Sequence, residues 1–237
     1  MENRIHCGDI TVTVNLQLDT LTEVSGSLTI KNGCTFTAPE LTKVSGFVDI
    51  HKGATFTAPK LTNISYVSVH RGATFTAPAL AKVSDVDVYE GATFSGPKLT
   101  EVSGYVYVYE DATFTAPKLT NTGYVSVYKG ATFTAPKLTE VSGSVYVRKG
   151  ATFTAHKLTH SGYVYVYEGA TFTAPKITNT DYVSVHEGAT FTAPKITEVS
   201  GSVYVRKGAT FTAPKLTNTG YVSVHEGATF SAPKLIH

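Results

Sequence analysis

The sequence predicts an all-β fold, a parallel β-solenoid (β-helix) of about eleven coils, and two observations lead to this prediction. First, the motif Gly-Ala-Thr-Phe-Thr-Ala-Pro-Lys returns with small changes every 19 or 20 residues through most of the chain. Second, apolar and polar residues alternate within each repeat, which is the period of a half-buried strand. A unit this short cannot bury its own apolar face, so the repeats are expected to stack into a continuous core.

Each coil contains two alternating stretches, as residues 138–157 illustrate. Val145 and Val147 are predicted to face the core from a first strand, and Phe153 from a second strand in which Thr residues flank it on the outer face. The Phe of the second strand recurs in eleven copies, as Phe36, Phe56, Phe75, Phe94, Phe114, Phe133, Phe153, Phe172, Phe191, Phe211 and Phe230. These side chains are therefore predicted to form one inward ladder.

Turns separate the strands of the coil. Gly150 is expected to supply the positive φ of the sharp turn between the first and second strands. A Pro then ends the second strand in most coils, where its missing N–H does little harm. Leu138 and Val141 are predicted to fill a third, shorter side.

The chain divides into two parts by pattern. Residues 1–20 lack the repeat and are predicted to be N-terminal capping strands, while residues 21–237 are predicted to be a solenoid of eleven tandem repeats. The single-residue difference between coils of 19 and 20 residues occurs at the corner, as a comparison of residues 119–123 with 138–143 shows. A solenoid is expected to absorb the difference there without a slip of register.

The segment 21–30, Leu-Thr-Glu-Val-Ser-Gly-Ser-Leu-Thr-Ile, resembles the repeat of leucine-rich-repeat-like and receptor-L-domain-like solenoid proteins. The pattern of spaced aliphatic residues, a Gly and an alternating strand returns at 41–50, 99–108, 138–147 and 196–205. The likeness covers about half of each coil; the coil length and the Phe-centred strand depart from it. The resemblance implies a parallel β-solenoid that binds protein or glycan and has no enzymatic activity.

The outward Thr residues on either side of the Phe form the first candidate site, and this Thr-x-Thr ladder resembles the ice-binding face of β-solenoid antifreeze proteins. Its members are Thr55, Thr57, Thr74, Thr76, Thr113, Thr115, Thr132, Thr134, Thr152, Thr154, Thr171, Thr173, Thr190, Thr192, Thr210 and Thr212. Alternate residues of a strand lie ~6.6 Å apart and neighbouring coils ~4.8 Å, which gives a flat grid of hydroxyl and methyl groups that could order water. The alternative is that Thr simply suits an exposed β surface.

Tyr residues form the second candidate site, because all fourteen are predicted to face outward around the first strand. The predicted binding residues are Tyr105, Tyr107, Tyr109, Tyr124, Tyr146, Tyr163, Tyr165, Tyr167, Tyr204 and Tyr221. Exposed Tyr is enriched at binding surfaces, so this face is predicted to recognise a protein or a glycan. Stacking of Tyr between coils, which would stabilise the sheet, is an equally good explanation.

Charge excludes some partners. The formal charge of +2 argues against binding to nucleic acid or to an anionic membrane. A row of Lys follows the Pro corner, as Lys60, Lys98, Lys118, Lys137, Lys157, Lys176, Lys195, Lys215 and Lys234. Because Glu residues lie nearby in sequence, this row is interpreted as a solvated corner rather than as a site for an anionic polymer.

No cofactor, metal or catalytic site is predicted. His156 and His160 are four residues apart, but no further ligand repeats beside them. Cys7 and Cys34 do not form a disulfide framework. The sequence shows neither a signal peptide nor an apolar run that could span a membrane, so a cytoplasmic location or a place in a larger assembly, such as a virus particle, is expected.

These observations favour a non-enzymatic repeat protein that acts as a structural or binding rod, with ice binding through the Thr ladder as the alternative. The last repeat is expected to leave Phe230 uncovered at the C-terminal end of the stack. Another copy of the chain or another subunit is therefore the predicted partner at that end.

Overall fold

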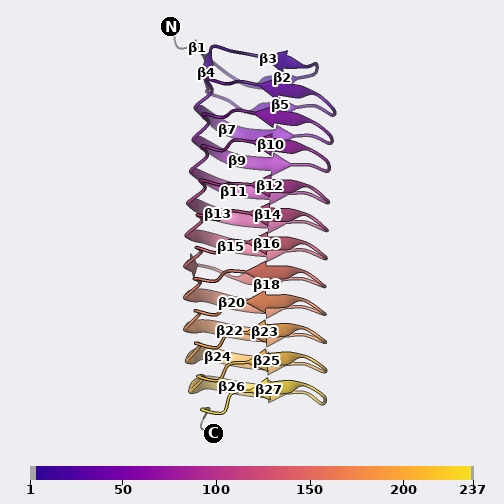
Figure 1. Ribbon diagram of the computed structural model, residues 1–237. Coiled ribbons are helices and arrows are strands. Elements are labelled where there is room, and N and C mark those ends of the chain that lie inside the picture. The colour runs from indigo at the N-terminus through magenta and orange to yellow at the C-terminus, as the bar shows by residue number, and fades with distance from the viewer. Residues whose placement is uncertain (1–3, 236–237) are drawn as a thin grey trace. The chain divides into compact units, whose positions relative to one another are not determined.

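The chain folds into parallel β-solenoids, as a computed structural model of residues 4–235 shows (Figure 1). It forms two compact units that divide between Leu119 and Thr120, and each is described by itself. The first unit contains five strands of the Thr-Phe-Thr or Thr-Phe-Ser type and the second contains six. With the turn that holds residues 16–17 there are about twelve turns in all, against the eleven predicted. Within the described residues all regular structure is β, which confirms the predicted fold class.

Two parallel sheets build the first unit. The Tyr-bearing sheet contains β1 (Arg4–His6), β2 (Ile10–Val12), β4 (Leu21–Val24), β5 (Leu28–Ile30), β7 (Lys43–Ile50), β9 (Asn63–Val69), β11 (Lys82–Val88) and β13 (Glu101–Val108). The Thr-bearing sheet contains β3 (Leu16–Gln17), β6 (Thr35–Thr37), β8 (Thr55–Thr57), β10 (Thr74–Thr76), β12 (Thr93–Ser95) and β14 (Thr113–Thr115). Each strand pairs with its counterpart one coil further along the chain.

The second unit repeats this arrangement. Its Tyr-bearing sheet contains β15 (Asn121–Val127), β17 (Glu140–Val141), β18 (Val145–Val147), β20 (His160–Val166), β22 (Asn179–Val185), β24 (Glu198–Val205) and β26 (Asn218–Val224). Its Thr-bearing sheet contains β16 (Thr132–Thr134), β19 (Thr152–Thr154), β21 (Thr171–Thr173), β23 (Thr190–Thr192), β25 (Thr210–Thr212) and β27 (Thr229–Ser231).

The predicted Phe ladder lies in the core of each unit. In the second unit the rings of Phe153 and Phe172 stack with their centroids 5.1 Å apart, and those of Phe172 and Phe191 with theirs 5.0 Å apart. Phe172 is fully buried, as are Val164 and Val166 of the facing sheet. Identical side chains thus stack on one another at the strand spacing, which confirms the predicted inward positions.

The third side of the coil differs from the prediction. In most coils the stretch expected to form a separate short side continues into the first strand, so that β24 runs unbroken for eight residues, from Glu198 to Val205. Hydrogen bonds between coils continue through the bend, as when Gly162 N–H donates to Gly143 C=O over 2.9 Å. The coil at residues 140–147 divides into β17 and β18 at this corner, but both strands belong to the same sheet, so each unit has two sheets.

The length difference between coils is absorbed where the sequence predicted it. The register between β22 and β24 shifts between Thr180 and Val183, and that between β24 and β26 shifts between Val199 and Ser202. All Thr-Phe-Thr strands of the second unit, in contrast, pair residue for residue. The irregularity therefore leaves the Thr-bearing sheet undisturbed.

Residues 4–17 form strands of their own. β1, β2 and β3 pair in parallel with β4, β5 and β6. In the sequence, Ile10, Val12 and Val14 alternate with Thr, which predicts that the three share one face of a strand; yet Val12 is buried and Val14 is 67% exposed. Val14 lies between β2 and β3, where the chain is not extended, so the period-two pattern does not apply to it.

Glycine at the sharp turn has the predicted conformation. Gly150 has φ of 64°, and the corresponding Gly residues of the other turns have similar positive values. Asp111 occupies this place in one turn and also has a positive φ, of 56°. Asp is one of the few residues with a side chain that tolerate the left-handed region, because it bonds locally to the backbone.

Among the described residues, no helix long and apolar enough to cross a lipid bilayer is present.

Candidate binding faces

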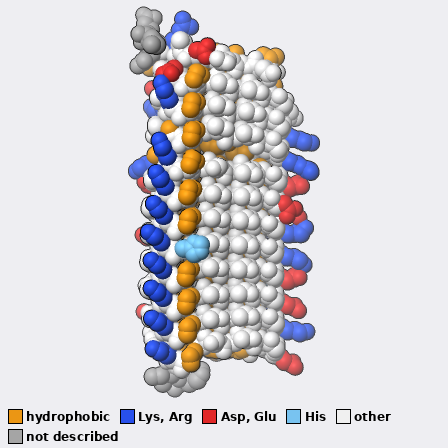
Figure 2. Space-filling view, viewed as in Figure 1, with side chains coloured by type: hydrophobic (Ala, Val, Ile, Leu, Met, Phe, Trp, Pro, Cys, Tyr) orange, Lys and Arg blue, Asp and Glu red, His pale blue; other side chains and the backbone are white. Residues whose placement is uncertain are grey.

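The Thr face consists of the outward Thr residues of the Thr-Phe-Thr strands. In the second unit, parallel pairing aligns Thr152 with Thr171 and Thr190, and Thr154 with Thr173 and its successors, which makes two straight columns. Figure 2 shows the face of this unit as a flat field without charged side chains. A column of hydrophobic side chains and one of Lys or Arg border one side of the field. The predicted Thr residues are therefore brought together within each unit.

The hydroxyl groups of the Thr face are free to bind solvent. Within the part of the chain that the structure describes, no hydroxyl of the Thr-Phe-Thr strands makes a hydrogen bond to the protein, and the side chains are exposed or half-buried. Water is therefore the available partner of these hydroxyls.

A second Thr column, at the corner after the Lys row, was not predicted as a distinct feature. Thr159 donates its hydroxyl to the carbonyl of Thr139 over 2.9 Å, and Thr178 donates to the carbonyl of Thr159 over 3.1 Å. The same bond recurs along both units, at Thr42, Thr62, Thr100, Thr139, Thr197 and Thr217. The recurrence of Leu-Thr or Ile-Thr after the Lys was the sequence signal that could have predicted this column. The hydroxyls of these corner Thr residues bond to the preceding coil, whereas the hydroxyls of the Thr face have no partner in the described part of the protein.

The Tyr face carries the fourteen Tyr residues, none of which is buried, as predicted. Their rings contact one another. Tyr146 stacks on Tyr165 with centroids 4.7 Å apart, Tyr165 lies 5.3 Å from Tyr182, and Tyr182 lies 5.7 Å from Tyr204. Tyr182 was not among the predicted binding residues, although it occupies the centre of this row. In the first unit, Tyr105 stacks on Tyr107 at 4.4 Å.

Small side chains fill the gaps below these rings. Ser184 shares a register position with Tyr165 and Tyr204, and only 2% of it is exposed. Ser126 lies opposite Tyr146 and is also buried. The Tyr rings therefore cover the Ser positions, so that much of the aromatic surface is used in packing between coils.

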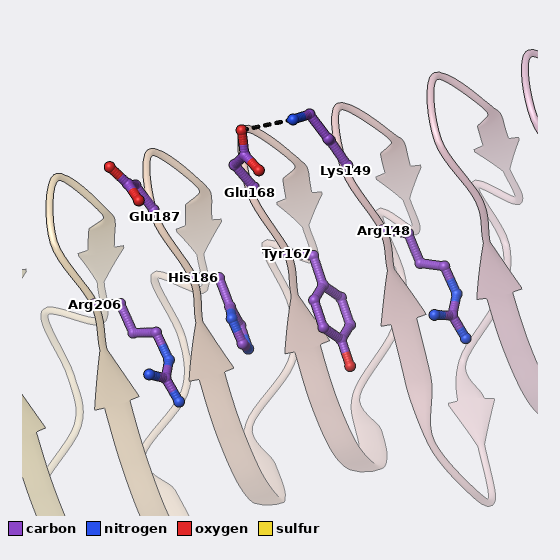
Figure 3. A pocket seen from close by; sticks show the side chains of 7 residues that line it. All are labelled: Arg148, Lys149, Tyr167, Glu168, His186, Glu187 and Arg206. Carbon is purple, nitrogen blue, oxygen red and sulfur yellow. Dashed lines mark ion pairs between the residues drawn. The ribbon is translucent and has the colours of Figure 1, made fainter.

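A depression of about 490 Å³ lies on the second unit. Figure 3 shows the side chains that line it. A column formed by Arg148, Tyr167, His186 and Arg206 lines one side of it, and Lys149, Glu168 and Glu187 of the turns line the other. The ring of Tyr167 stacks on that of His186 with centroids 4.6 Å apart.

The cations of this depression have different surroundings. The Arg148 guanidinium lies 4.5 Å from the ring centroid of Tyr128 and 5.9 Å from that of Tyr167, so it leans away from the depression. Burial, and secondarily the charge of Arg206, lowers the pKa of His186. Lys149 pairs with Glu168 at 2.8 Å. The site thus combines aromatic edges with charges of both signs.

A polar network on the first unit was not predicted. His51 and His70 contact the two carboxylate oxygens of Asp49, at 3.0 and 2.9 Å, through their Nε2 atoms. Ser68 Oγ also contacts Nε2 of His70, at 3.1 Å. A Ser-His-Asp relay needs the hydroxyl and the carboxylate on different ring nitrogens, and here both lie on the same one.

Asp87 lies in the same column as Asp49 and Ser68, and it is almost fully buried. Tyr66 donates its hydroxyl to Asp87 Oδ2 over 2.6 Å, whereas Oδ1 has no partner. Burial raises the pKa of Asp87 despite the hydrogen bond from Tyr66, which lowers it. The ionised carboxylate is therefore unfavourable in the folded state.

Asp87→Asn is expected to stabilise the first unit at neutral pH by roughly 1 kcal/mol, because it removes a buried, incompletely paired charge. Since the folded state holds the proton more tightly than the unfolded state, the wild-type protein gains stability as the pH falls through the raised pKa of Asp87. The variant should lose this gain. Urea unfolding between pH 4 and pH 7 measures both effects. Asp85→Asn is the control, because Asp85 accepts a hydrogen bond from the backbone N–H of Tyr105 and its replacement should not stabilise the protein. Equal stabilisation by the two variants would contradict the view that the carboxylate of Asp87 is unfavourably buried.

Within residues 4–235, no group of three or more His, Cys, Asp or Glu side chains is placed to hold a metal ion. Both Cys7 and Cys34 are free thiols.

The last described turn is less covered than the others. Val224 is 45% exposed and Tyr221 55%, and Phe230 is half-buried. These residues line a depression of about 650 Å³. Contact of this turn with another copy or another subunit stays a prediction.

Fold and faces together define the chain as a parallel β-solenoid repeat protein with one Thr face and one Tyr face. Comparison with protein-family models, with curated proteins and with solved structures found no match.

Proposed function

We propose that this protein is a non-enzymatic solenoid whose Thr face binds ice or an ice-like layer of ordered water. One observation carries the proposal: the Thr-Phe-Thr hydroxyls are aligned in columns and have no hydrogen-bond partner within the described protein, while the corner Thr hydroxyls are bonded from coil to coil. Only the first set is available to organise water.

The physical argument rests on regularity. Hydroxyls repeat at ~6.6 Å along a strand and ~4.8 Å between coils, which makes a regular two-dimensional grid for bound water. The Phe rings stacked directly beneath hold these positions, because a ladder of buried identical rings restricts motion of the strands. Methyl groups on the same Thr residues limit competing orientations of water. Ordering of water on such a face needs no catalytic group.

Thermal hysteresis and ice-crystal shape test the proposal. The purified protein should lower the freezing point below the melting point and should facet growing crystals. Replacement of Thr152, Thr171 and Thr190 by Tyr should abolish both effects, because each bulky ring interrupts the flat array. The control exchanges Tyr146 and Tyr165 for Ser on the opposite sheet and should retain activity. Disc-shaped crystals at high concentration of wild-type protein would contradict ice binding.

Recognition of a protein or glycan by the Tyr face is the second candidate. The depression between Arg148 and Arg206 supports it, because aromatic edges and charged groups there could contact a polar ligand. The exposed ring of Tyr163 adds a further contact surface. Absence of ice activity, together with binding on a glycan array that Tyr163→Ser and Arg206→Gln remove, would favour this function instead.

A further inference from the structure

The two units carry opposite charge, which the small net charge of the chain conceals. Residues 120–237 contain eleven Lys and Arg against six Asp and Glu, a formal charge of +5, whereas residues 1–119 contain nine against twelve, a formal charge of −3. Such an asymmetry between halves points to a partner of opposite charge for the basic half.

Much of the excess positive charge of the second unit lies in one line, called here the Lys edge. It consists of Lys137, Lys157, Lys176, Lys195, Lys215 and Lys234, all exposed. Each lies three residues after an aligned Thr or Ser of the Thr-bearing sheet, so the parallel register places one Lys on every coil. Figure 2 shows the column of Lys and Arg side chains along this border.

The backbone holds the Lys edge in a repeated geometry. Each Lys occupies the same tight turn, closed by a hydrogen bond such as Ile177 N–H to Ala174 C=O at 3.2 Å or Leu216 N–H to Ala213 C=O at 3.0 Å. Pro stands at the second position of most of these turns, where its fixed φ is favourable. The bonded corner Thr follows one position after the turn. A ligand that binds the row would thus order only the Lys side chains.

Charges on the Lys edge are not neutralised within the unit. Among residues 120–235, no Lys of this edge takes part in an ion pair, although Glu140 and Glu198 lie close to it in sequence. The opposite edge of the same unit differs, because Lys149 pairs with Glu168 and the turn positions carry both signs. Neighbouring coils are ~4.8 Å apart, within the Debye length of ~8 Å at physiological salt, so adjacent ammonium groups repel one another. A polyanion would relieve this repulsion.

We propose that the Lys edge binds an extended acidic polysaccharide with one carboxylate on each sugar unit. A sugar unit of such a chain is nearly as long as one coil step, so its carboxylates recur along the chain axis at nearly the spacing of the ammonium groups. Double-stranded DNA fits less well, because its phosphates follow a helical path and carry one charge per ~1.7 Å of axis. Single-stranded nucleic acid is usually held by aromatic side chains, and the turns of this edge bear Pro or His beside the Lys. This surface is distinct from the Thr face and the Tyr face.

Binding to polygalacturonate tests the proposal, with the fully methyl-esterified polymer as the uncharged match. The whole protein should bind the acid polymer at low salt, lose affinity as salt is raised, and ignore the ester. Lys176→Gln with Lys195→Gln should weaken binding roughly tenfold or more, as expected when about two ion pairs with a polyanion are lost. Lys129→Gln with Lys207→Gln removes the same charge from the opposite edge, outside the depression on the Tyr face, and should change affinity less than about twofold.

Several outcomes would overturn the inference. Equal losses in the two double variants would show that net charge alone attracts the polymer. Tighter binding to duplex DNA or to vesicles of phosphatidylserine than to polygalacturonate would assign the edge to another class of partner. No measurable binding at low salt would refute the site. Because all four Lys residues are exposed, thermal unfolding of the variants should match that of the wild type, which separates loss of binding from loss of fold.

Discussion

Phe172→Ala is expected to lower the free energy of unfolding by roughly 3–5 kcal/mol, the usual cost of removing a fully buried Phe. The ring stacks between Phe153 at 5.1 Å and Phe191 at 5.0 Å, and none of it is exposed. Removal would leave a cavity that cannot close, because the hydrogen-bonded strands on both sides fix the distance between coils. Unfolding in urea, followed by circular dichroism, measures the change.

Thr171→Ala is the matched control, one residue away on the opposite face of the same strand. Its hydroxyl has no partner in the described protein, so the change should cost well under about 1 kcal/mol. Similar losses for the two variants would mean that the core and solvent faces of the strand had been exchanged. Because both residues share β21, the comparison removes any effect of position along the chain.

Gly162→Ala is expected to cost roughly 2–3 kcal/mol, because an added Cβ would overpack a backbone contact between coils. That Cβ would lie 2.8 Å from the carbonyl oxygen of Gly143, the same oxygen that accepts the Gly162 N–H at 2.9 Å. Relief of the clash requires the two coils to separate and the hydrogen bond to lengthen. Thermal unfolding of the purified variant measures the loss.

Gly188→Asn provides the contrasting variant. Gly188 has φ of 63°, and nothing lies within 4 Å of the place where a Cβ would be. Asn tolerates the left-handed region, as Asp111 does in an equivalent turn, so the change should cost less than about 1 kcal/mol. We assign the need for Gly162 to steric crowding at the corner and the need for Gly188 to its backbone conformation in the turn. A larger loss of stability for Gly188→Asn than for Gly162→Ala would contradict this assignment.

The three surfaces of the second unit differ in charge. The Thr face is flat and uncharged, the Tyr face is packed from coil to coil, and the Lys edge presents unneutralised ammonium groups. Ice or ordered water and an acidic polysaccharide would therefore occupy different surfaces. Variants on one surface should leave binding at the other unchanged, since each is built from a different position of the repeat.

Sequence periodicity alone determined the fold class, the inward Phe ladder and the outward Thr and Tyr positions. A fixed period with alternation leaves one arrangement that turns every Phe of the ladder toward the core, as the stacking of Phe172 between its neighbours illustrates. The turn glycines followed from the same pattern, because Gly150 and its equivalents occupy one position that requires positive φ. Periodicity, alternation and the turn residues therefore predicted the structure of each coil except at the corner.

Only the tertiary structure decided how the coils bond to one another. Whether the corner forms a separate side depends on hydrogen bonds between Gly162 and Gly143, which lie nineteen residues apart. Three further features also depend on neighbouring coils. Among the described residues, the hydroxyl of Thr159 is hydrogen-bonded whereas that of Thr171 is not, Asp87 is buried, and the Lys edge has no ion pairs. A sequence pattern specifies which way a side chain points, but its partners lie one coil away, and their distances and charges are set only when the coils stack.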